Sequence, residues 1–367
     1  MADGTSRTLA RAEDAAGMKA DLISIQYLRA MAALGVLVFH TCERAGLSFG
    51  PGAAGVDVFF IISGFIMWVV SARRSYSPGE FLVRRAGRIA PLYWSVTLFV
   101  VALDLLRPAL FPHMRLSLGH VLTSLLFIPH ADPNGAVAPV IVPGWTLNYE
   151  VFFYVAFALT LLLPVGRRAL ALSAGLALLC LAGLAVGRGQ PVVAAYTDPL
   201  ILEFVAGVWL AKAWHAGRLS SPGRAWAMIL LAGLILLAVA ASGVDVSGWA
   251  RLPCWGLPAV LIVWGALSLE RAGRVPTVPL LKLMGDASYS IYLAHGLALS
   301  LAFKVLADRG LAPHVQLALA VPFAVMVGIG CHFALELPLL ALFHGRRRRV
   351  PGLKAGPASW AFLRAKA

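Results

Sequence analysis

The feature that most constrains this chain is a series of apolar segments long enough to cross a lipid bilayer. Helices of about 17–25 apolar residues span the hydrocarbon core, and such segments recur along almost all of the 367 residues. Charged residues make up only 13% of the chain and lie mainly between these segments. These properties exclude a soluble globular domain and predict an all-α integral membrane protein.

The apolar runs predict about ten transmembrane helices. Their expected ranges are 22–43, 54–72, 89–106, 145–164, 168–186, 196–214, 225–242, 253–269, 286–306 and 315–343. A shorter apolar piece between the third and fourth ranges, 121–128, cannot span and is expected to be re-entrant or to lie at the surface.

Three regions follow from this pattern. They are a cytoplasmic N-terminal tail (1–21), a membrane domain (22–343) and a basic cytoplasmic C-terminal tail (344–367). The N-terminal tail is polar and lacks the apolar core of a signal peptide, so the first helix is expected to be retained.

The distribution of Lys and Arg predicts the orientation, because cytoplasmic loops are enriched in both residues. With the N-terminus in the cytoplasm, 23 of the 31 Lys and Arg residues fall in cytoplasmic segments and seven in outer segments. Both termini are therefore expected in the cytoplasm. The same distribution accounts for most of the net charge of +14, so no nucleic-acid partner is needed to explain it. The four Cys residues have no zinc-site spacing, which indicates no metal.

Ionisable residues inside predicted helices are the functional candidates, since placing them in a membrane is costly. Arg29 and His40 lie on one face of the first helix, about 16 Å apart along its axis. Glu150 lies about 7–8 Å deeper than the interfacial Trp145, at a level that matches His40. A Glu–His pair orients an imidazole as a general base. The alternative is a hydrogen bond between helices that carries no chemistry.

Weaker candidates lie on other helices. Asp57 begins the second helix, where a cap or helix-dipole role is as plausible as a functional one. His295, on the ninth helix, is expected at the depth of Arg29. Two further buried carboxylates are expected to serve the structure: Glu203 and Glu336.

An arginine pair lies at the predicted cytoplasmic end of the third helix. Arg85 and Arg88 share one helical face, and Tyr93 follows them as the helix enters the membrane. Two guanidinium groups in this place form an anion receptor that faces the cytosol. The alternative is anchoring by positive charge alone.

Together these segments resemble the acyltransferase-3 family of bacterial integral-membrane O-acyltransferases, over about residues 22–343. The matching motifs, in order, are R-x10-H at Arg29 and His40, GVDVFFIISGF from Gly55, R-x-x-R-x-x-P-x-Y from Arg85 to Tyr93, WTLNYEVFFY with Glu150, SYSIYLAH with His295, and Glu336 before Pro338. The first helix, IQYLRAMAALGVLVFH, is particularly similar to the exopolysaccharide-production branch.

The resemblance implies a multi-pass protein of the bacterial inner membrane. Such a protein transfers an acyl group, usually acetyl from acetyl-CoA on the cytoplasmic side, to a carbohydrate hydroxyl. The expected partners are acyl-CoA, a carbohydrate acceptor, the lipid bilayer and polysaccharide-assembly proteins, with no metal cofactor and no nucleic acid.

In the predicted mechanism, His40 is the general base, Glu150 orients it, and Arg29 holds the donor or the developing oxyanion. Asp57 and His295 are secondary candidates, and Arg85, Arg88 and Tyr93 are expected to bind acyl-CoA. An acyl-histidine intermediate on His40 remains open. The alternative function is a transporter or flippase, because intramembrane Arg, His and Glu also line substrate paths. No internal repeat supports that alternative.

Overall fold

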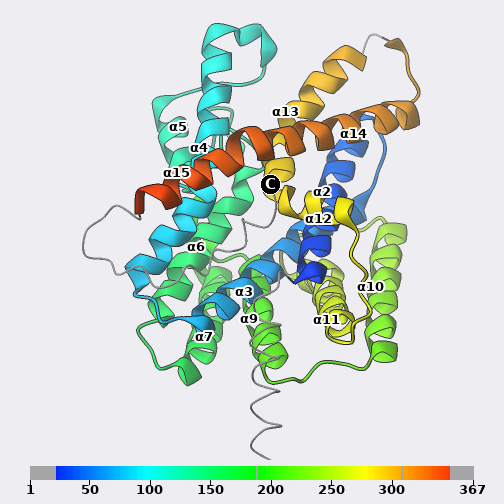
Figure 1. The fold of residues 1–367 in the computed structure, drawn as a ribbon. Coiled ribbons are helices and arrows are strands. Elements are labelled where there is room, and N and C mark those ends of the chain that lie inside the picture. The colour runs from blue at the N-terminus through cyan, green and yellow to red at the C-terminus, as the bar shows by residue number, and fades with distance from the viewer. Residues whose placement is uncertain (1–21, 187–188, 307–308, 348–367) are drawn as a thin grey trace, which may run out of the picture.

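The computed structural model describes residues 22–186, 189–306 and 309–347, which form helices joined by loops (Figure 1). The predicted N-terminal tail, and residues 348–367 of the predicted C-terminal tail, lie outside the described residues. The long helices are α2 (Ile23–Arg44), α3 (Gly55–Arg73), α4 (Pro78–Leu106), α6 (Gly144–Thr160), α7 (Val165–Val186), α9 (Leu202–His215), α10 (Pro222–Ser242), α11 (Leu257–Arg271), α13 (Ser288–Leu306) and α14 (Pro313–Cys331).

Shorter elements join or extend these helices. The short α-helices are α5 (Leu118–Leu125), α8 (Pro191–Tyr196), α12 (Pro279–Asp286) and α15 (Leu337–Arg347). The single turns are the 3-10 turns η1 (Gly50–Ala54), η2 (Pro108–Leu110), η3 (Pro199–Ile201) and η4 (Gly248–Ala250), and the π turns η5 (Leu252–Gly256) and η7 (His332–Glu336).

The all-α membrane architecture is confirmed, since each predicted range coincides with a helix. Among the described residues, eight helices are long and apolar enough to cross a membrane. With 14 residues, α9 is shorter than the length that spans a bilayer, and α6, with 17, is at the lower limit of that length. The number of membrane crossings therefore stays a prediction.

The third helix begins earlier than its apolar run. Pro78 is its first residue, and the Ser77 hydroxyl accepts a hydrogen bond from the Glu80 amide at 3.2 Å. Ser at the cap and Pro in the first turn both favour a helix start. Arg85 and Arg88 consequently lie inside α4 and not in a cytoplasmic loop.

The apolar piece between α4 and α6 forms α5, which is too short to span, as predicted. It packs against α4, where the Tyr93 hydroxyl donates to the Ser124 carbonyl at 3.1 Å and Trp94 Nε1 donates to the Leu125 carbonyl at 2.8 Å. This segment therefore packs against the middle of α4.

Most of α3 is buried, and its closest approach is to α9. Two glycines allow this approach: Gly64 faces the Phe204 carbonyl and Gly207 faces the Ile61 carbonyl. Small residues let helix backbones come this close in a membrane. Figure 1 shows α14 and α15 as a nearly continuous helix that crosses in front of α4 and α13.

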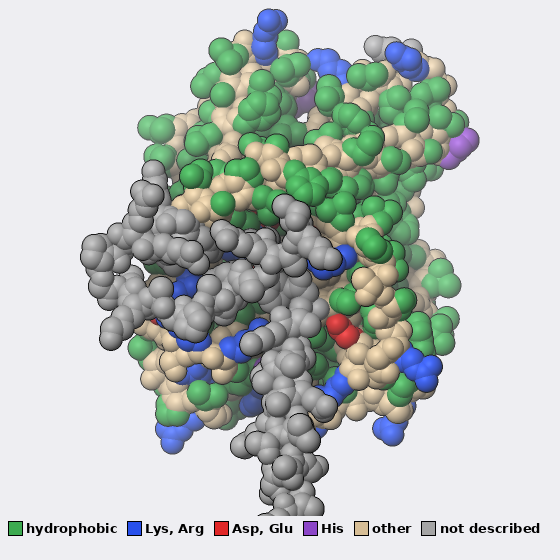
Figure 2. Space-filling view, in the orientation of Figure 1, with side chains coloured by type: hydrophobic (Ala, Val, Ile, Leu, Met, Phe, Trp, Pro, Cys, Tyr) green, Lys and Arg blue, Asp and Glu red, His purple; other side chains and the backbone are tan. Residues whose placement is uncertain are grey.

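The helix ends meet in two groups that match the predicted sides of the membrane. At the predicted cytoplasmic end, Glu270 accepts from the Ile23 amide at 2.7 Å, and Arg271 donates to the Trp214 carbonyl at 3.2 Å. At the predicted outer end, Arg44 donates to Ser300 at 3.1 Å. Hydrophobic side chains cover much of the upper half of the face shown in Figure 2, and several Lys and Arg side chains lie at its lower margin.

Candidate active site

A buried ion pair joins α4 to the last helix. Glu336 is 1% exposed and accepts hydrogen bonds from Arg88 Nη1 at 2.5 Å and from the Ser290 hydroxyl at 2.6 Å. His332 Nδ1 lies 2.8 Å from the same carboxylate. The π turn η7 carries both His332 and Glu336, and both are buried. Arg88 is thus held by a carboxylate, and the expected structural role of Glu336 fits this contact.

Two other arginines, the half-buried Arg29 and the buried Arg85, have no such partner. Arg29 donates to the Gln26 side chain at 3.1 Å, and Arg85, 8% exposed, packs over the Phe81 ring with its Nε unbonded. Among the described residues, neither arginine forms an ion pair with a carboxylate. A buried charge is costly unless it is paired. These two guanidinium groups are therefore suited to an anionic or carbonyl-bearing ligand.

Glu150 belongs to this arginine cluster. Its carboxylate accepts hydrogen bonds from Tyr154, one turn further along α6, and from Ser63 of α3 at 3.2 Å. It also lies near enough to Arg85 and Arg88 for direct electrostatic attraction. The cluster holds three arginines, Arg29, Arg85 and Arg88, against two carboxylates, Glu150 and Glu336. One positive charge therefore remains in excess.

His40 lies at the predicted outer end of α2, away from this cluster. Its Nδ1 is 2.8 Å from the Glu43 carboxylate, and its ring stacks on that of His295 with centroids 5.3 Å apart. Its side chain is 36% exposed. The predicted contact between His40 and Glu150 is wrong, because each side chain has other partners.

The depth in the membrane that the sequence predicts for Glu150 is also wrong, and the packing of α6 explains why. Thr146 is the α6 residue near His40, since its hydroxyl lies 3.0 Å from that of Tyr292, whose ring centroid is 5.8 Å from His295. Glu150 lies one turn, or about 6 Å, further along α6. The prediction treats Trp145 as interfacial, whereas its side chain is half-buried and lines a cavity together with the segment that precedes α6.

The predicted depth of His295 is also wrong, because His295 is level with His40 and not with Arg29. Gly285, just before α13, packs against the Gln26 backbone. Helices α2 and α13 then run side by side in the same direction, which brings His295 to His40. His295 is 3% exposed, and its Nδ1 donates to the Tyr292 carbonyl at 2.5 Å.

Asp57 is fully buried and paired. Arg251 donates to its two oxygens, from Nε at 2.9 Å and from Nη2 at 2.7 Å. This bidentate contact ties α3 to the turns before α11 and favours the structural interpretation of Asp57. The carboxylate of Glu203 is buried next to that of Asp57. Sequence reasoning missed Arg251, which it counted only as an outer-loop charge.

Tyr93 is fully buried on the side of α4 that faces α5, where its ring lies 4.9 Å from that of Phe127. The structure does not bring it together with the two free arginines. Within the described ranges, no group of three or more His, Cys, Asp or Glu side chains is arranged to hold a metal ion.

Sequence comparison assigns the chain to a known kind of enzyme. The family described as "Acyltransferase domain" matches residues 22–335. The chain belongs to the acyltransferase-3 family. The predicted resemblance is confirmed, and this membrane protein is an acyltransferase.

Several curated relatives match most of this acyltransferase. The exopolysaccharide production protein ExoZ of Rhizobium meliloti is 44% identical over 328 residues, which cover 88% of this chain and 100% of that protein. Acyltransferase MdmB of Streptomyces mycarofaciens is 28% identical, covering 90% of this chain and 94% of its own. The peptidoglycan O-acetyltransferase OatA of Listeria monocytogenes is 25% identical over 77% of this chain and 50% of its own. No solved structure matches the chain significantly.

Proposed function

We propose that this acyltransferase moves an acyl group, acetyl in the first instance, from cytoplasmic acyl-CoA to a hydroxyl of an exopolysaccharide or another cell-surface carbohydrate. The observation that carries the proposal is the placing of two chemical centres along α2. Arg29 and Arg85, which form no ion pair with a carboxylate among the described residues, belong to one cluster, and an imidazole oriented by Glu43 lies about 16 Å from Arg29 at His40. The printed names of ExoZ and OatA support the carbohydrate acceptor.

The arginine cluster is the proposed donor site. Arg29 and Arg85 would bind the phosphates or carbonyls of acyl-CoA, because their charges lack a carboxylate partner among the described residues. Arg88 and Tyr93 are already bonded to Glu336 and Ser124, so we assign them a supporting role. Glu150 would hold Tyr154 and limit the excess positive charge of the cluster.

His40 is the proposed general base. If its Nδ1–H donates to Glu43, its Nε2 keeps a lone pair that can accept the proton of the acceptor hydroxyl. The resulting alkoxide attacks the thioester carbonyl, the new C–O bond forms as the C–S bond breaks, and the thiolate leaving group takes the proton back from His40. General-base assistance of this kind contributes about 10²–10⁴ in rate.

The proposal also gives the orientation of the site in the membrane. The protein would be a multi-pass protein of the bacterial inner membrane, with the arginine cluster open to the cytoplasm and His40 facing outward. Arg29 is too far from His40 to stabilise an oxyanion there, since hydrogen bonds reach about 3 Å. We therefore assign Arg29 to the donor alone. Polysaccharide-assembly proteins at the outer face are the proposed partners.

The test of the reaction uses purified protein in nanodiscs with labelled acetyl-CoA and polysaccharide from the cell surface. Label should appear as an ester on the carbohydrate, and His40→Ala should lower the rate about 10²-fold or more. The matched control is His314→Ala, which changes an exposed histidine at the start of α14. A wild-type rate in His40→Ala would refute the role of His40.

The test of the donor site compares two neighbouring arginines. Arg85→Ala should raise the KM for acetyl-CoA about tenfold or more, because it removes a buried charge that forms no ion pair with a carboxylate among the described residues. Arg84→Ala is the control, since Arg84 is bonded to Glu80 at 3.0 Å. Equal KM values in the two variants would return Arg85 to an anchoring role.

A further inference from the structure

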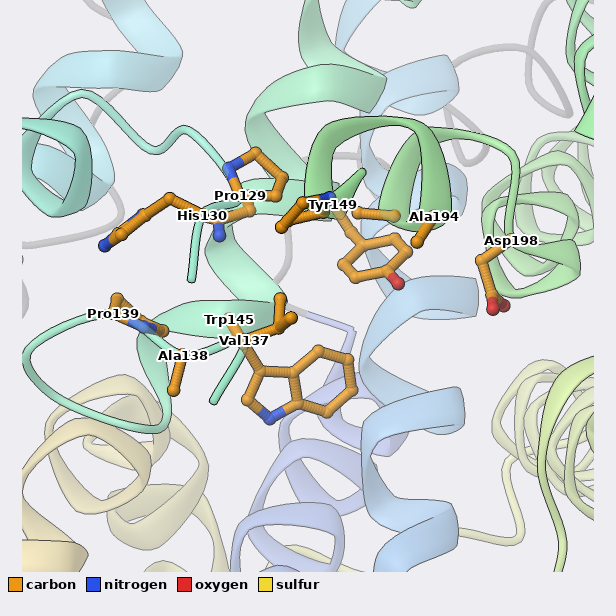
Figure 3. A pocket seen from close by; sticks show the side chains of 12 residues that line it. Pro129, His130, Val137, Ala138, Pro139, Trp145, Tyr149, Ala194 and Asp198 are labelled. Carbon is orange, nitrogen blue, oxygen red and sulfur yellow. The ribbon is translucent and has the colours of Figure 1, made fainter. Parts of the chain in front are cut away.

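A cavity of about 240 Å³ opens beside the first turns of α6. Three parts of the chain enclose it: α6, the segment that precedes α6, and the segment from α8 to η3. Figure 3 shows the indole of Trp145 and the phenol of Tyr149 projecting from α6 into this space, with Pro139 and His130 across from them. One water takes up roughly 30 Å³, so the cavity has room for a ligand the size of one sugar ring.

The wall of the cavity combines aromatic faces with hydrogen-bonding groups. The rings of Trp145 and Tyr149 meet edge to face, with centroids 5.7 Å apart, so one ring plane is presented at right angles to the other. Asp198 lines the same cavity from the start of η3. An apolar face with a few fixed polar groups is the general composition of small-molecule sites. The C–H face of a pyranose packs on aromatic rings, and its hydroxyls bond to side chains such as these.

Asn148 carries a polar atom that the protein itself does not use. The residue is 4% exposed and lines the cavity, and its Oδ1 has no hydrogen-bond partner. Buried polar atoms are nearly always bonded, and leaving one unbonded costs about 1–3 kcal/mol. This orphan acceptor indicates that the cavity is built for a ligand that donates hydrogen bonds.

Unlike Asn148, His130 offers the cavity no unbonded polar atom. Its Nδ1 bonds to the Ile128 carbonyl and its Nε2 to His120 Nδ1, both at 2.7 Å. Both ring nitrogens are therefore used, and His130 shapes the wall without offering a free group. The unbonded polar atom that a ligand can use, Asn148 Oδ1, comes from α6.

The cavity is linked to the proposed catalytic base through α6. Trp145 precedes Thr146, whose hydroxyl lies 3.0 Å from the Tyr292 hydroxyl. The rings of Tyr292, His295 and His40 then follow at centroid distances of 5.8 and 5.3 Å. The cavity thus borders the first turns of α6, which lead through Thr146 and Tyr292 toward His40.

We propose that this cavity binds one sugar ring of the acceptor carbohydrate, with Trp145 and Tyr149 as the stacking surface and Asn148 as the hydrogen-bonding group. This inference rests on the proposed transfer to carbohydrate, and it adds the place where the acceptor is held. A sugar fixed there would keep the neighbouring unit of a polymer near His40.

The first experiment measures binding without catalysis. Purified protein in nanodiscs is titrated with cellotetraose, maltotetraose and chitotetraose, with binding followed by calorimetry. We expect at least one tetrasaccharide to bind, and Trp145→Ala to weaken that binding about tenfold or more. Trp226→Ala is the matched control, because Trp226 is an exposed residue of α10 remote from the cavity lining; it should bind as the wild type does.

The second experiment measures the KM values for labelled acetyl-CoA and for the polysaccharide acceptor. Trp145→Ala should raise the acceptor KM about tenfold and leave the acetyl-CoA KM unchanged. An unchanged acceptor KM overturns the proposed subsite while the proposed function stands. If no carbohydrate is acylated at all, the proposed function fails and the binding titration alone decides the subsite.

Asn148→Leu separates a ligand-binding role from a structural one. Replacing an unbonded buried amide by an apolar side chain of similar size should leave the thermal midpoint unchanged or raise it. Acceptor affinity should nevertheless fall about fivefold or more. A lower midpoint with unchanged acceptor affinity would show that Asn148 serves the fold and would overturn its assigned role.

Discussion

The orientation of a general base depends on which ring nitrogen carries the proton. In this protein the carboxylate of Glu43, three residues after His40 on the same helix, lies 2.8 Å from Nδ1, so the proposed proton transfer uses Nε2. Both side chains are partly exposed, at 36% and 54%. Exposed pairs contribute about 0–1 kcal/mol to stability, so the effect of this pair should appear in the rate and not in the melting temperature.

A double-mutant cycle tests this assignment. Glu43→Ala should lower turnover about tenfold and Glu43→Gln less, because the amide oxygen can still accept from Nδ1. In a His40→Ala background, Glu43→Ala should have almost no additional effect, since interacting residues are not additive. The measurement is acetyl transfer at equal amounts of folded protein.

Glu150 supplies the control for the cycle. Because Glu150 bonds Ser63 and Tyr154 and does not contact Glu43, the losses in Glu43→Ala and Glu150→Ala should multiply. Full independence of Glu43 and His40, with strong coupling of Glu150 to His40, would restore the pairing expected from the sequence.

At the scale of elements, the contact between α3 and α9 positions Ser63 under Glu150. A Cβ atom at Gly207 would lie 2.0 Å from the Ile61 carbonyl, which the two backbones cannot accommodate without moving apart. Overpacking of this kind costs about 1–3 kcal/mol. Small residues at this crossing are thus required by the geometry of the backbone.

Gly207→Ala should therefore lower the thermal midpoint in detergent by several degrees and reduce turnover, because the Ser63–Glu150 contact shifts with α3. Gly233→Ala on α10 is the matched control, since nothing lies within 4 Å of its added Cβ. A similar midpoint in both variants would show that α3 and α9 can separate at no cost.

The α5 segment has a predicted response to acid. Burial, and then the neighbouring His130, lower the pKa of His120 below its usual range. A lowered pKa means that the neutral form is favoured in the folded state, so its stabilisation is complete above about pH 6.5 and is lost as the pH falls through the lowered value. The protection factors of residues 118–140, which correct hydrogen exchange for its intrinsic dependence on pH, should be smaller at pH 5 than at pH 7.5.

His120→Gln checks the cause of that response, because glutamine does not titrate. Exchange in this segment should then depend on pH only through the intrinsic chemistry of amide exchange. A variant that keeps the acid-induced opening would assign it to groups other than His120.

For the whole molecule, the helices could be predicted because the hydropathy of a membrane segment is encoded locally. The start of α4 could not be placed from hydropathy, since its first turns are polar and are set by Ser77 and Pro78. The partners of the charged residues could not be predicted from the sequence either. Asp57 and Arg251 are 194 positions apart, and Arg88 and Glu336 are 248 apart, so only the packing of α3, α4 and the last helix brings them together.

The proposed site has a donor end at the arginine cluster and an acceptor end at His40, and its function depends on the predicted membrane topology. The Lys and Arg distribution places the loop at Arg218 and Arg224 in the cytoplasm and the loop at Asp245 outside. Reporters inserted after Arg224 and after Arg349 should read cytoplasmic, and one inserted after Asp245 should read periplasmic.

The packing of α11 restricts the possible outcomes of this topology test. The cytoplasmic-end contact between Arg271 and Trp214 and the outer-end pair of Asp57 and Arg251 lie at opposite ends of α11 and its preceding turns. The reporters at Arg224 and Asp245 must therefore disagree in any orientation in which α10 crosses the membrane. If the Arg224 reporter reads periplasmic, the arginine cluster faces away from cytoplasmic acyl-CoA, and the proposed direction of transfer is wrong even where His40 remains essential.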